Sequence, residues 1–169
     1  MRLLEPGDAE AIQSLANDKE LADTTLGIPH PYPEGAAFHF VQARRDAALR
    51  GDGYSFAVKR KEDGAFLGIV GLHVNKTHHM GELAYWIGKP YWRNGYCSEA
   101  AERVLQFAFD ELMLNRVYAA AMTRNPASYK VMEKIGMKFE GILRSHIRKG
   151  ECYEDLRHYG LLRTDARGY

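Results

Sequence analysis

The alternation of apolar and polar residues along the chain predicts a mixed α/β fold. Short apolar or alternating runs predict strands at residues 2–4, 54–60, 66–74, 82–88, 117–123, 137–147 and 153–163. Apolar residues at helical spacing, with capping and stop signals, predict helices at residues 8–17, 34–50, 96–113 and 125–135. Residues 26–35 hold three prolines and two glycines, so this segment is expected to be irregular.

The order of these elements predicts which strands are neighbours. Strands 54–60, 66–74 and 82–88 follow one another through short connections, the first of which is a hairpin signal at 61–64, so they are expected to form an antiparallel meander. A helix joins strands 82–88 and 117–123, so these two are expected to be parallel neighbours. A mixed sheet with one parallel pair predicts a ligand site at the carboxyl ends of that pair.

Composition and charge narrow the class of protein. The 169 residues are 46% hydrophobic and 27% charged, with a formal net charge of +1, which fits one globular domain over residues 1–169. Near-neutral charge argues against a nucleic-acid partner, and no run approaches the roughly 18 apolar residues of a membrane span. Cys97 and Cys152 form no C-x-x-C pair, and the first residues do not resemble a signal peptide. A reducing, cytoplasmic location is therefore expected.

A glycine-containing turn, residues 92–98, leads into the predicted helix 96–113. Gly95 has no side chain to block a close backbone approach, and the unpaired amides of a helix start attract anions. The turn therefore predicts a pyrophosphate site to which Arg93 adds a charge. A plain glycine turn capped by Ser98 explains the same residues, and neither a P-loop nor a Rossmann glycine pattern is present.

Two further groups flank the same crevice. Asn125 and Ser128 open the helix after the second parallel strand, where they either cap the helix or direct polar groups at a ligand. Glu82 begins the first parallel strand, on one face with Ala84 and Trp86. A carboxylate on a half-apolar face suits a general base, because desolvation favours its neutral form. The alternative is an exposed glutamate at a strand start.

These motifs, taken in order, resemble those of the GNAT N-acetyltransferase superfamily. The segments 82–88, 91–100, 125–128 and 133–141 carry the resemblance, which is strongest over residues 80–141 and extends over nearly the whole chain. Within the superfamily, the chain is most similar to the branch of ribosomal-protein N-terminal acetyltransferases. The resemblance implies an acyl-CoA N-acyltransferase fold, with a mostly antiparallel sheet, one splayed parallel strand pair and flanking helices.

The resemblance also implies that acetyl-CoA lies between strands 82–88 and 117–123. In this family the turn before the helix holds the pyrophosphate, the pantetheine arm follows the first parallel strand, and a backbone N–H near Trp86 and Ile87 stabilises the oxyanion. The implied cofactor-binding residues are Trp86, Ile87, Arg93, Asn94, Gly95, Tyr96, Cys97, Ser98, Asn125, Ser128 and Lys130. Cys97 stands where the family has Gly or Ala, and is either an inert buried thiol or a site of oxidation.

The implied reaction is direct acetyl transfer to a primary amine. Glu82 is expected to act as the base, either directly or through a water molecule. Many members of the superfamily have a Tyr seven residues after the helix-opening Asn, a position that Met132 occupies here. Ser128 is therefore expected to hydrogen-bond the leaving sulfur, with Tyr129 and Tyr96 as alternatives.

The acceptor is expected to be a protein N-terminus, with a small amine such as an antibiotic or a polyamine as the alternative. The loop 27–35 with Tyr32 resembles the family's substrate-side loop, and the hairpin 144–155 with Tyr153 is expected to form the opposite acceptor wall. The alternative is that these are ordinary loop residues. Histidines 73, 78 and 79 lack an acidic partner at helical spacing, so no metal is expected. By resemblance to the family, the chain could form a homodimer. Two rivals are a catalytically silent acyl-CoA-binding regulatory module and an unrelated nucleotide-binding α/β domain.

Overall fold

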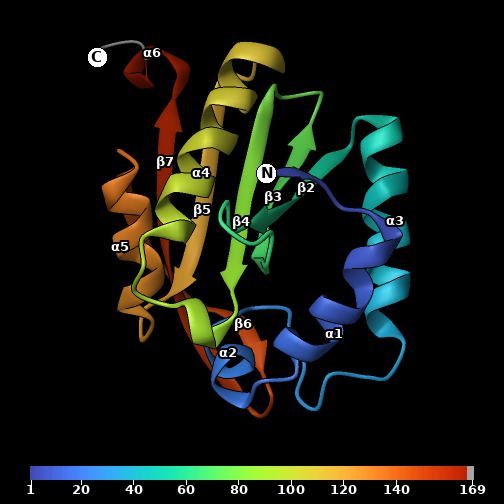
Figure 1. Ribbon diagram of the computed structural model, residues 1–169. Helices are drawn as coiled ribbons and strands as arrows, with labels where there is room; N and C mark the ends of the chain where they lie inside the picture. Colours follow the sequence, from blue (N-terminus) through green and yellow to red (C-terminus); the bar gives the residue numbers. More distant parts are fainter. Residues whose placement is uncertain (167–169) are drawn as a thin grey trace.

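A seven-stranded mixed sheet organises the computed structural model, which describes residues 1–166 (Figure 1). The strands lie in the order β1-β2-β3-β4-β5-β7-β6, and only β4 and β5 are parallel. The predicted meander and the predicted parallel pair are therefore confirmed. The strand bounds are β1 (Arg2–Leu3), β2 (Gly53–Lys59), β3 (Phe66–Asn75), β4 (Met80–Ile87), β5 (Arg116–Met122), β6 (Lys138–Lys149) and β7 (Cys152–Leu162).

The helices agree with the prediction in four places and differ in three. They are α1 (Ala9–Ala16), α2 (Lys19–Thr24), α3 (Ala36–Arg50), α4 (Tyr96–Gln106), α5 (Pro126–Lys134) and α6 (Arg163–Ala166). The predicted helix 96–113 is interrupted, because α4 gives way to a π-helical turn at Phe107–Glu111. Neither α6 nor α2 was predicted, although Asp18 accepts a capping bond from the Leu21 N–H at 2.9 Å. Short 3-10 turns also occupy Pro6–Asp8 and Lys89–Tyr91.

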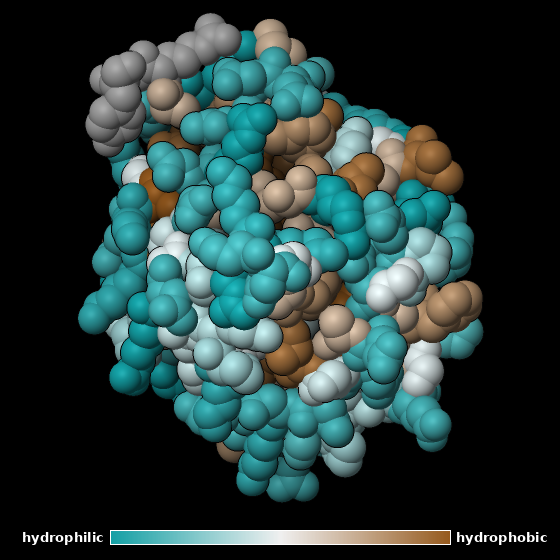
Figure 2. Space-filling view, in the orientation of Figure 1, coloured by the Kyte–Doolittle hydropathy of each residue, from teal (hydrophilic) through white to brown (hydrophobic). Residues whose placement is uncertain are grey.

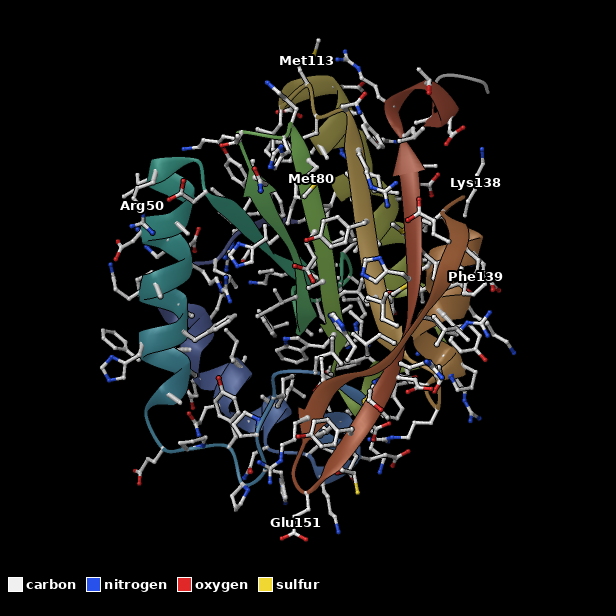
Figure 3. All side chains as sticks on the ribbon, turned by 180° about the vertical axis from the view of Figure 1, so that it is seen from behind. Arg50, Met80, Met113, Lys138, Phe139 and Glu151 are labelled. Carbon is white, nitrogen blue, oxygen red and sulfur yellow. The ribbon has the colours of Figure 1, made fainter. Side chains whose placement is uncertain are left out.

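The two faces of the sheet carry two separate cores. On one face, side chains of β4, β5 and β7 pack with α4 and α5 around buried Leu83, Val104 and Tyr159. On the other face, α1 and α3 cover β2 and β3, with Ile12 and Val41 in the smaller core. Seen from behind, β4 and β5 lie uncovered between α3 and the β6–β7 hairpin (Figure 3). One half of the second face is therefore open to ligands.

The parallel strands β4 and β5 separate soon after they meet. Their register covers three pairs, the last of which joins Glu82 to Tyr118. Farther along β4, the Gly88 N–H donates to the Leu67 carbonyl at 2.8 Å, so Gly88 faces β3. Because successive residues of a strand direct their N–H groups to opposite sides, Tyr85 and Ile87 direct theirs away from β3. We call the space that they face the β4–β5 gap.

Asp8 joins β1 to the first helix in a way that the sequence did not predict. Its carboxylate does not cap α1; it accepts two hydrogen bonds from the Arg2 guanidinium, at 2.7 and 2.8 Å, and one from the Glu5 N–H at 2.8 Å. Burial by itself raises the pKa of Asp8, but the bonds from Arg2 and Glu5 outweigh it and hold this pKa below the usual 3.8.

The variant Asp8→Asn is expected to have an unfolding free energy about 1–3 kcal/mol lower than wild type at pH 7. The reason is that the Arg2 guanidinium and the Glu5 N–H lose their charged hydrogen-bond acceptor. Because the pKa of Asp8 is lower in the folded protein than in the unfolded chain, its carboxylate stabilises the fold fully at a pH above the unfolded pKa. This stabilisation is lost as the pH falls through the folded pKa. The difference between the two proteins in urea denaturation should therefore shrink below about pH 4. Asp110→Asn, at an exposed position, is the matched control. A constant difference down to pH 2 would contradict the assignment.

Candidate active site

Glu82 lies on the open face of the sheet, within a row of polar side chains. It is half-buried, and the Tyr118 hydroxyl donates to its Oε2 at 3.3 Å. Exposed His73 is its partner in the register on β3, and the His158 ring stacks on Tyr118 with centroids 5.5 Å apart. Burial and the nearby Glu82 charge raise the pKa of Tyr118, so the phenol stays protonated and donates to the carboxylate.

The turn before α4 presents free backbone amides. Gly95 has a φ of 81° and Arg93 a φ of 63°, while Asn94 donates to the carbonyls of Tyr91 and Trp92 at 3.1 and 3.0 Å and so ties the turn together. The first helical bond runs from the Glu99 N–H to the Gly95 carbonyl. Among residues 1–166, no acceptor pairs with the amides of Tyr96, Cys97 or Ser98. An anion can therefore bind at this helix start.

A polar depression of about 260 Å³ adjoins this turn. The turn and α4 line it with Asn94, Gly95, Ser98, Glu99 and Glu102, and α5 contributes Lys134 and Ile135. The sequence singled out exposed Lys130 instead, which lies one helical turn before Lys134 on the same side of α5. Lys134 is therefore a positive charge near the helix start that sequence reasoning missed, although the spacing of four residues could have indicated it.

Cys97 follows the glycine turn and is largely shielded from solvent. Burial raises the pKa of its thiol to about 12, so the thiol is protonated at neutral pH. Because the thiolate is the reactive form, this burial favours the inert alternative over an oxidation site. Cys152, in contrast, is exposed at the start of β7.

Ser128 and Tyr85 meet across the β4–β5 gap. The Tyr85 hydroxyl donates to the Ser128 carbonyl at 2.8 Å, and the Ser128 Oγ lies 3.4 Å from the same hydroxyl. Burial raises the pKa of Tyr85, so the phenol remains protonated. Sequence reasoning did not single out Tyr85, because an aromatic residue in a strand usually belongs to the core. Met132, the position that holds a Tyr in many family members by resemblance, is buried.

Both polar atoms of the Asn125 side-chain amide form hydrogen bonds within the protein. Its Oδ1 accepts from the Ser128 N–H at 3.3 Å, which caps α5, and its Nδ2 donates to the Thr24 carbonyl at 2.8 Å. These bonds fit the capping alternative, and a ligand contact by this amide stays a prediction. The donor ties α5 to the end of α2, where Lys149 of β6 also donates to the Ala22 carbonyl at 2.5 Å.

Trp86 and Ile87 point to opposite faces of β4. Ile87 is buried against the α4 core, and its carbonyl accepts from the Trp92 Nε1 at 2.6 Å. The Ile87 N–H faces the β4–β5 gap and is suited to stabilise an oxyanion. The backbone N–H of Trp86 instead faces β3. The Trp86 ring packs against the smaller core on the α1 and α3 side.

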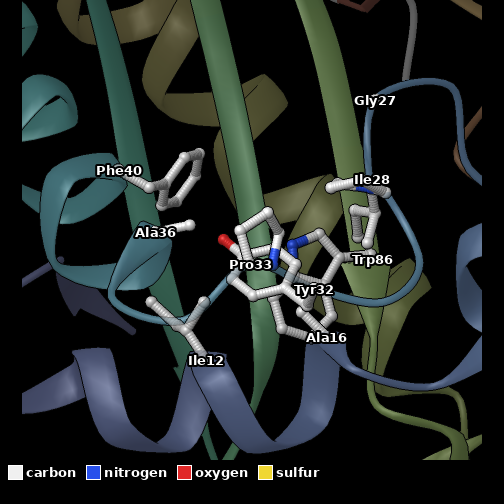
Figure 4. A pocket seen from close by; sticks show the side chains of 10 residues that line it. Ile12, Ala16, Gly27, Ile28, Tyr32, Pro33, Ala36, Phe40 and Trp86 are labelled. Carbon is white, nitrogen blue, oxygen red and sulfur yellow. The ribbon is translucent and has the colours of Figure 1, made fainter.

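An apolar pocket of about 250 Å³ lies beside Trp86, on the open side of β4. We call it the α1–α3 pocket, and Figure 4 shows its lining side chains. Tyr32, which was predicted to belong to an acceptor wall, is among its lining residues. Tyr153 is not among its lining residues and is 66% exposed on β7. The lining residues are Ile12, Ala16, Gly27, Ile28, Pro29, Tyr32, Pro33, Ala36, Phe40 and Trp86.

Residues 1–166 contain neither a cluster suited to a metal ion nor a helix suited to span a membrane. In the part of the chain that the structure describes, no three His, Cys, Asp or Glu residues are placed to hold a metal ion. No helix within residues 1–166 is long and apolar enough to span a membrane. The side of the molecule on which α4 lies is mainly hydrophilic, with scattered apolar patches (Figure 2).

Comparison with known proteins gives consistent results. The sequence model for the acetyltransferase (GNAT) domain matches residues 1–138. “Putative ribosomal N-acetyltransferase YdaF” of Bacillus subtilis is 30% identical over 99% of this chain and 93% of its own length. A GNAT-family acetyltransferase structure from Bacillus anthracis is 29% identical, with a TM-score of 0.85, over 96% of this chain and 93% of that one.

A third comparison concerns the fold alone. The spermidine N-acetyltransferase of Vibrio cholerae, solved in complex with CoA and spermine, is 22% identical to this chain with a TM-score of 0.83. The match covers 97% of this chain and 95% of that chain. The splayed sheet is thus shared with an acetyltransferase that binds CoA.

Proposed function

The chain belongs to the GNAT acetyltransferase family, and we propose that it transfers the acetyl group of acetyl-CoA to the N-terminal amine of a protein. We further propose that residues 1–169 act as one catalytic domain. The observation that carries the proposal is the β4–β5 gap, which has Glu82 at its start and the free amides of α4 near its end. The similarity to YdaF supports a protein acceptor, and the shared fold with the spermidine enzyme keeps a small amine as the alternative.

The proposed place of acetyl-CoA follows from the free polar groups of the backbone. The amides of Tyr96, Cys97 and Ser98 would bind the pyrophosphate, with Lys134 close enough to add a positive charge. The pantetheine arm carries amides, and it would pair with the N–H and C=O groups that β4 directs into the gap. Since α4 begins nine residues after β4 ends, we propose that one extended molecule uses both sets of groups.

The proposed chemistry assigns one role to each side chain at the gap. Glu82 accepts a proton from the acceptor ammonium, directly or through a water molecule, and the amine nitrogen attacks the thioester carbonyl carbon. The Ile87 N–H stabilises the negative charge that develops on the carbonyl oxygen. As the C–N bond forms and the C–S bond breaks, the sulfur leaves as a thiolate that accepts a hydrogen bond from the Ser128 hydroxyl. The second proton that the amine nitrogen loses converts this thiolate to the free thiol. Tyr118 holds the Glu82 carboxylate in place.

The experiment that tests the proposal compares two versions of one peptide, with a free and with a formyl-blocked N-terminus and an internal lysine in both. Wild-type protein and acetyl-CoA should release free thiol with the first peptide only, and mass spectrometry should find one acetyl group on its N-terminal residue. Spermidine serves as the third acceptor. Equal acetylation of both peptides, or turnover with spermidine alone, would overturn the proposed acceptor.

A further inference from the structure

The α1–α3 pocket is lined without charge. Among the described residues that line it, the side chains are aliphatic, aromatic or proline, and the polar groups that they carry are the Tyr32 hydroxyl and the Trp86 indole N–H. His30, Glu34 and His39, each next to a lining residue in sequence, are exposed and not part of the wall. A carboxylate in this pocket would lose hydration without a compensating partner.

The size of the pocket suits one side chain. Its volume of about 250 Å³ exceeds that of an engineered apolar cavity of about 150 Å³ that holds benzene. A leucine, methionine or phenylalanine side chain therefore fits, whereas a glycine or alanine residue would leave most of the pocket to water. Figure 4 shows that the walls come from α1, α3, β4 and the 27–33 segment.

The pocket and Glu82 lie on the same face of β4. Trp86 lines the pocket, Glu82 lies four residues away, at about 13 Å along the strand, and Ala84 is exposed between them. On β3, Gly71 pairs with Ala84, so the neighbouring strand also carries no side chain at this point. An amine above Ala84 thus has access to the β4–β5 gap, while a group attached to it reaches the pocket.

We infer, on the basis of the proposed function, that the N-terminal residue of the acceptor carries a large apolar side chain, which binds in the α1–α3 pocket. The described lining offers no carboxylate to pair with the second ammonium of a polyamine. The pocket therefore selects the acceptor by its first residue, and the acceptor class is a polypeptide beginning with a residue of leucine, methionine or phenylalanine size.

The test uses five peptide amides that differ only in the first residue, which is Leu, Phe, Gly, Glu or Lys, with acetyl-CoA and the full chain. The kcat/KM for Leu and Phe is expected to be at least about 10-fold above that for the other three, because a methylene in an apolar pocket changes discrimination by a factor of about 10 or more. Equal kcat/KM values for all five would overturn the inference and leave the proposed function standing. No turnover with any peptide would overturn both.

Two variants locate the preference in the pocket. Ala36→Phe fills the pocket, and it should lower kcat/KM for the Leu peptide to that of the Gly peptide without affecting the latter. Ala43→Phe, at an exposed position of the same helix, is the matched control and should change neither. Ile28→Glu, in the irregular segment, should reverse the order of the Leu and Lys peptides. The inference would be contradicted if Ala36→Phe lowered kcat/KM equally for the Leu and Gly peptides. It would also be contradicted if Ile28→Glu still had a higher kcat/KM for the Leu peptide than for the Lys peptide.

Discussion

Replacing Glu82 with Gln is expected to lower kcat/KM for amine acetylation by about 10²–10⁴-fold, the contribution of a positioned general base. Glutamine keeps the shape of the side chain and an oxygen that can accept from the Tyr118 hydroxyl, so the local structure should persist. Acetyl-CoA contacts the α4 amides and β4 backbone in this account, and these are unchanged. The stabilisation of the variant by acetyl-CoA should therefore equal that of wild type.

The measurement is initial-rate thiol release with the free-N-terminus peptide, together with thermal denaturation in the presence and absence of acetyl-CoA. Glu62→Gln, an exposed glutamate between β2 and β3, is the matched control and should retain wild-type rates. Wild-type turnover in Glu82→Gln would exclude Glu82 as the base. Loss of both turnover and acetyl-CoA stabilisation would show instead that Glu82 supports cofactor binding.

Gly68→Ala is expected to destabilise the fold by about 3 kcal/mol and to weaken acetyl-CoA binding at the same time. Gly68 is the register partner of Ile87. A Cβ atom there would overlap the Trp86 carbonyl oxygen and lie 2.8 Å from the Ile87 Cα. Because both neighbours are backbone, β3 and β4 must move apart, and the Ile87 N–H moves with β4.

Urea denaturation measures the first effect and acetyl-CoA titration the second. Gly7→Ala is the control, because no atom lies within 4 Å of a Cβ built there. Its unfolding free energy should stay within about 0.5 kcal/mol of wild type, as for most surface substitutions. Equal denaturation midpoints for Gly68→Ala and wild type would contradict the close packing of β3 on β4.

Local patterns predict much of the sheet and the position of the gap. Alternation places Glu82, Ala84 and Trp86 on one face, and the helix between β4 and β5 requires that they run parallel. Both features depend on neighbouring residues or on the order of elements, which the sequence displays directly. The glycine turn before α4 could be predicted from the sequence for the same reason. Gly95 adopts a positive φ there, a conformation that glycine favours.

The contacts that assemble the site depend on partners far apart in the chain. Tyr118 lies 36 residues after Glu82, and no local pattern sets the register that pairs them. The Asn125 amide bonds Thr24, which is 101 residues away, so its structural role could not be distinguished from ligand binding by sequence. The α1–α3 pocket likewise combines four segments whose packing is tertiary.

Acetyl-CoA is proposed to bind in the β4–β5 gap and at the start of α4. A thermal shift experiment measures this binding. Acetyl-CoA, CoA, ATP and NAD are compared at equal concentration on wild-type protein. A ligand at about 100 times its Kd adds roughly 2.7 kcal/mol of stability, or about 5–10 °C for a chain of this size. We predict such a shift with acetyl-CoA and CoA and little change with NAD or ATP. No shift with acetyl-CoA at millimolar concentration, or an equal shift with ATP, would contradict the account.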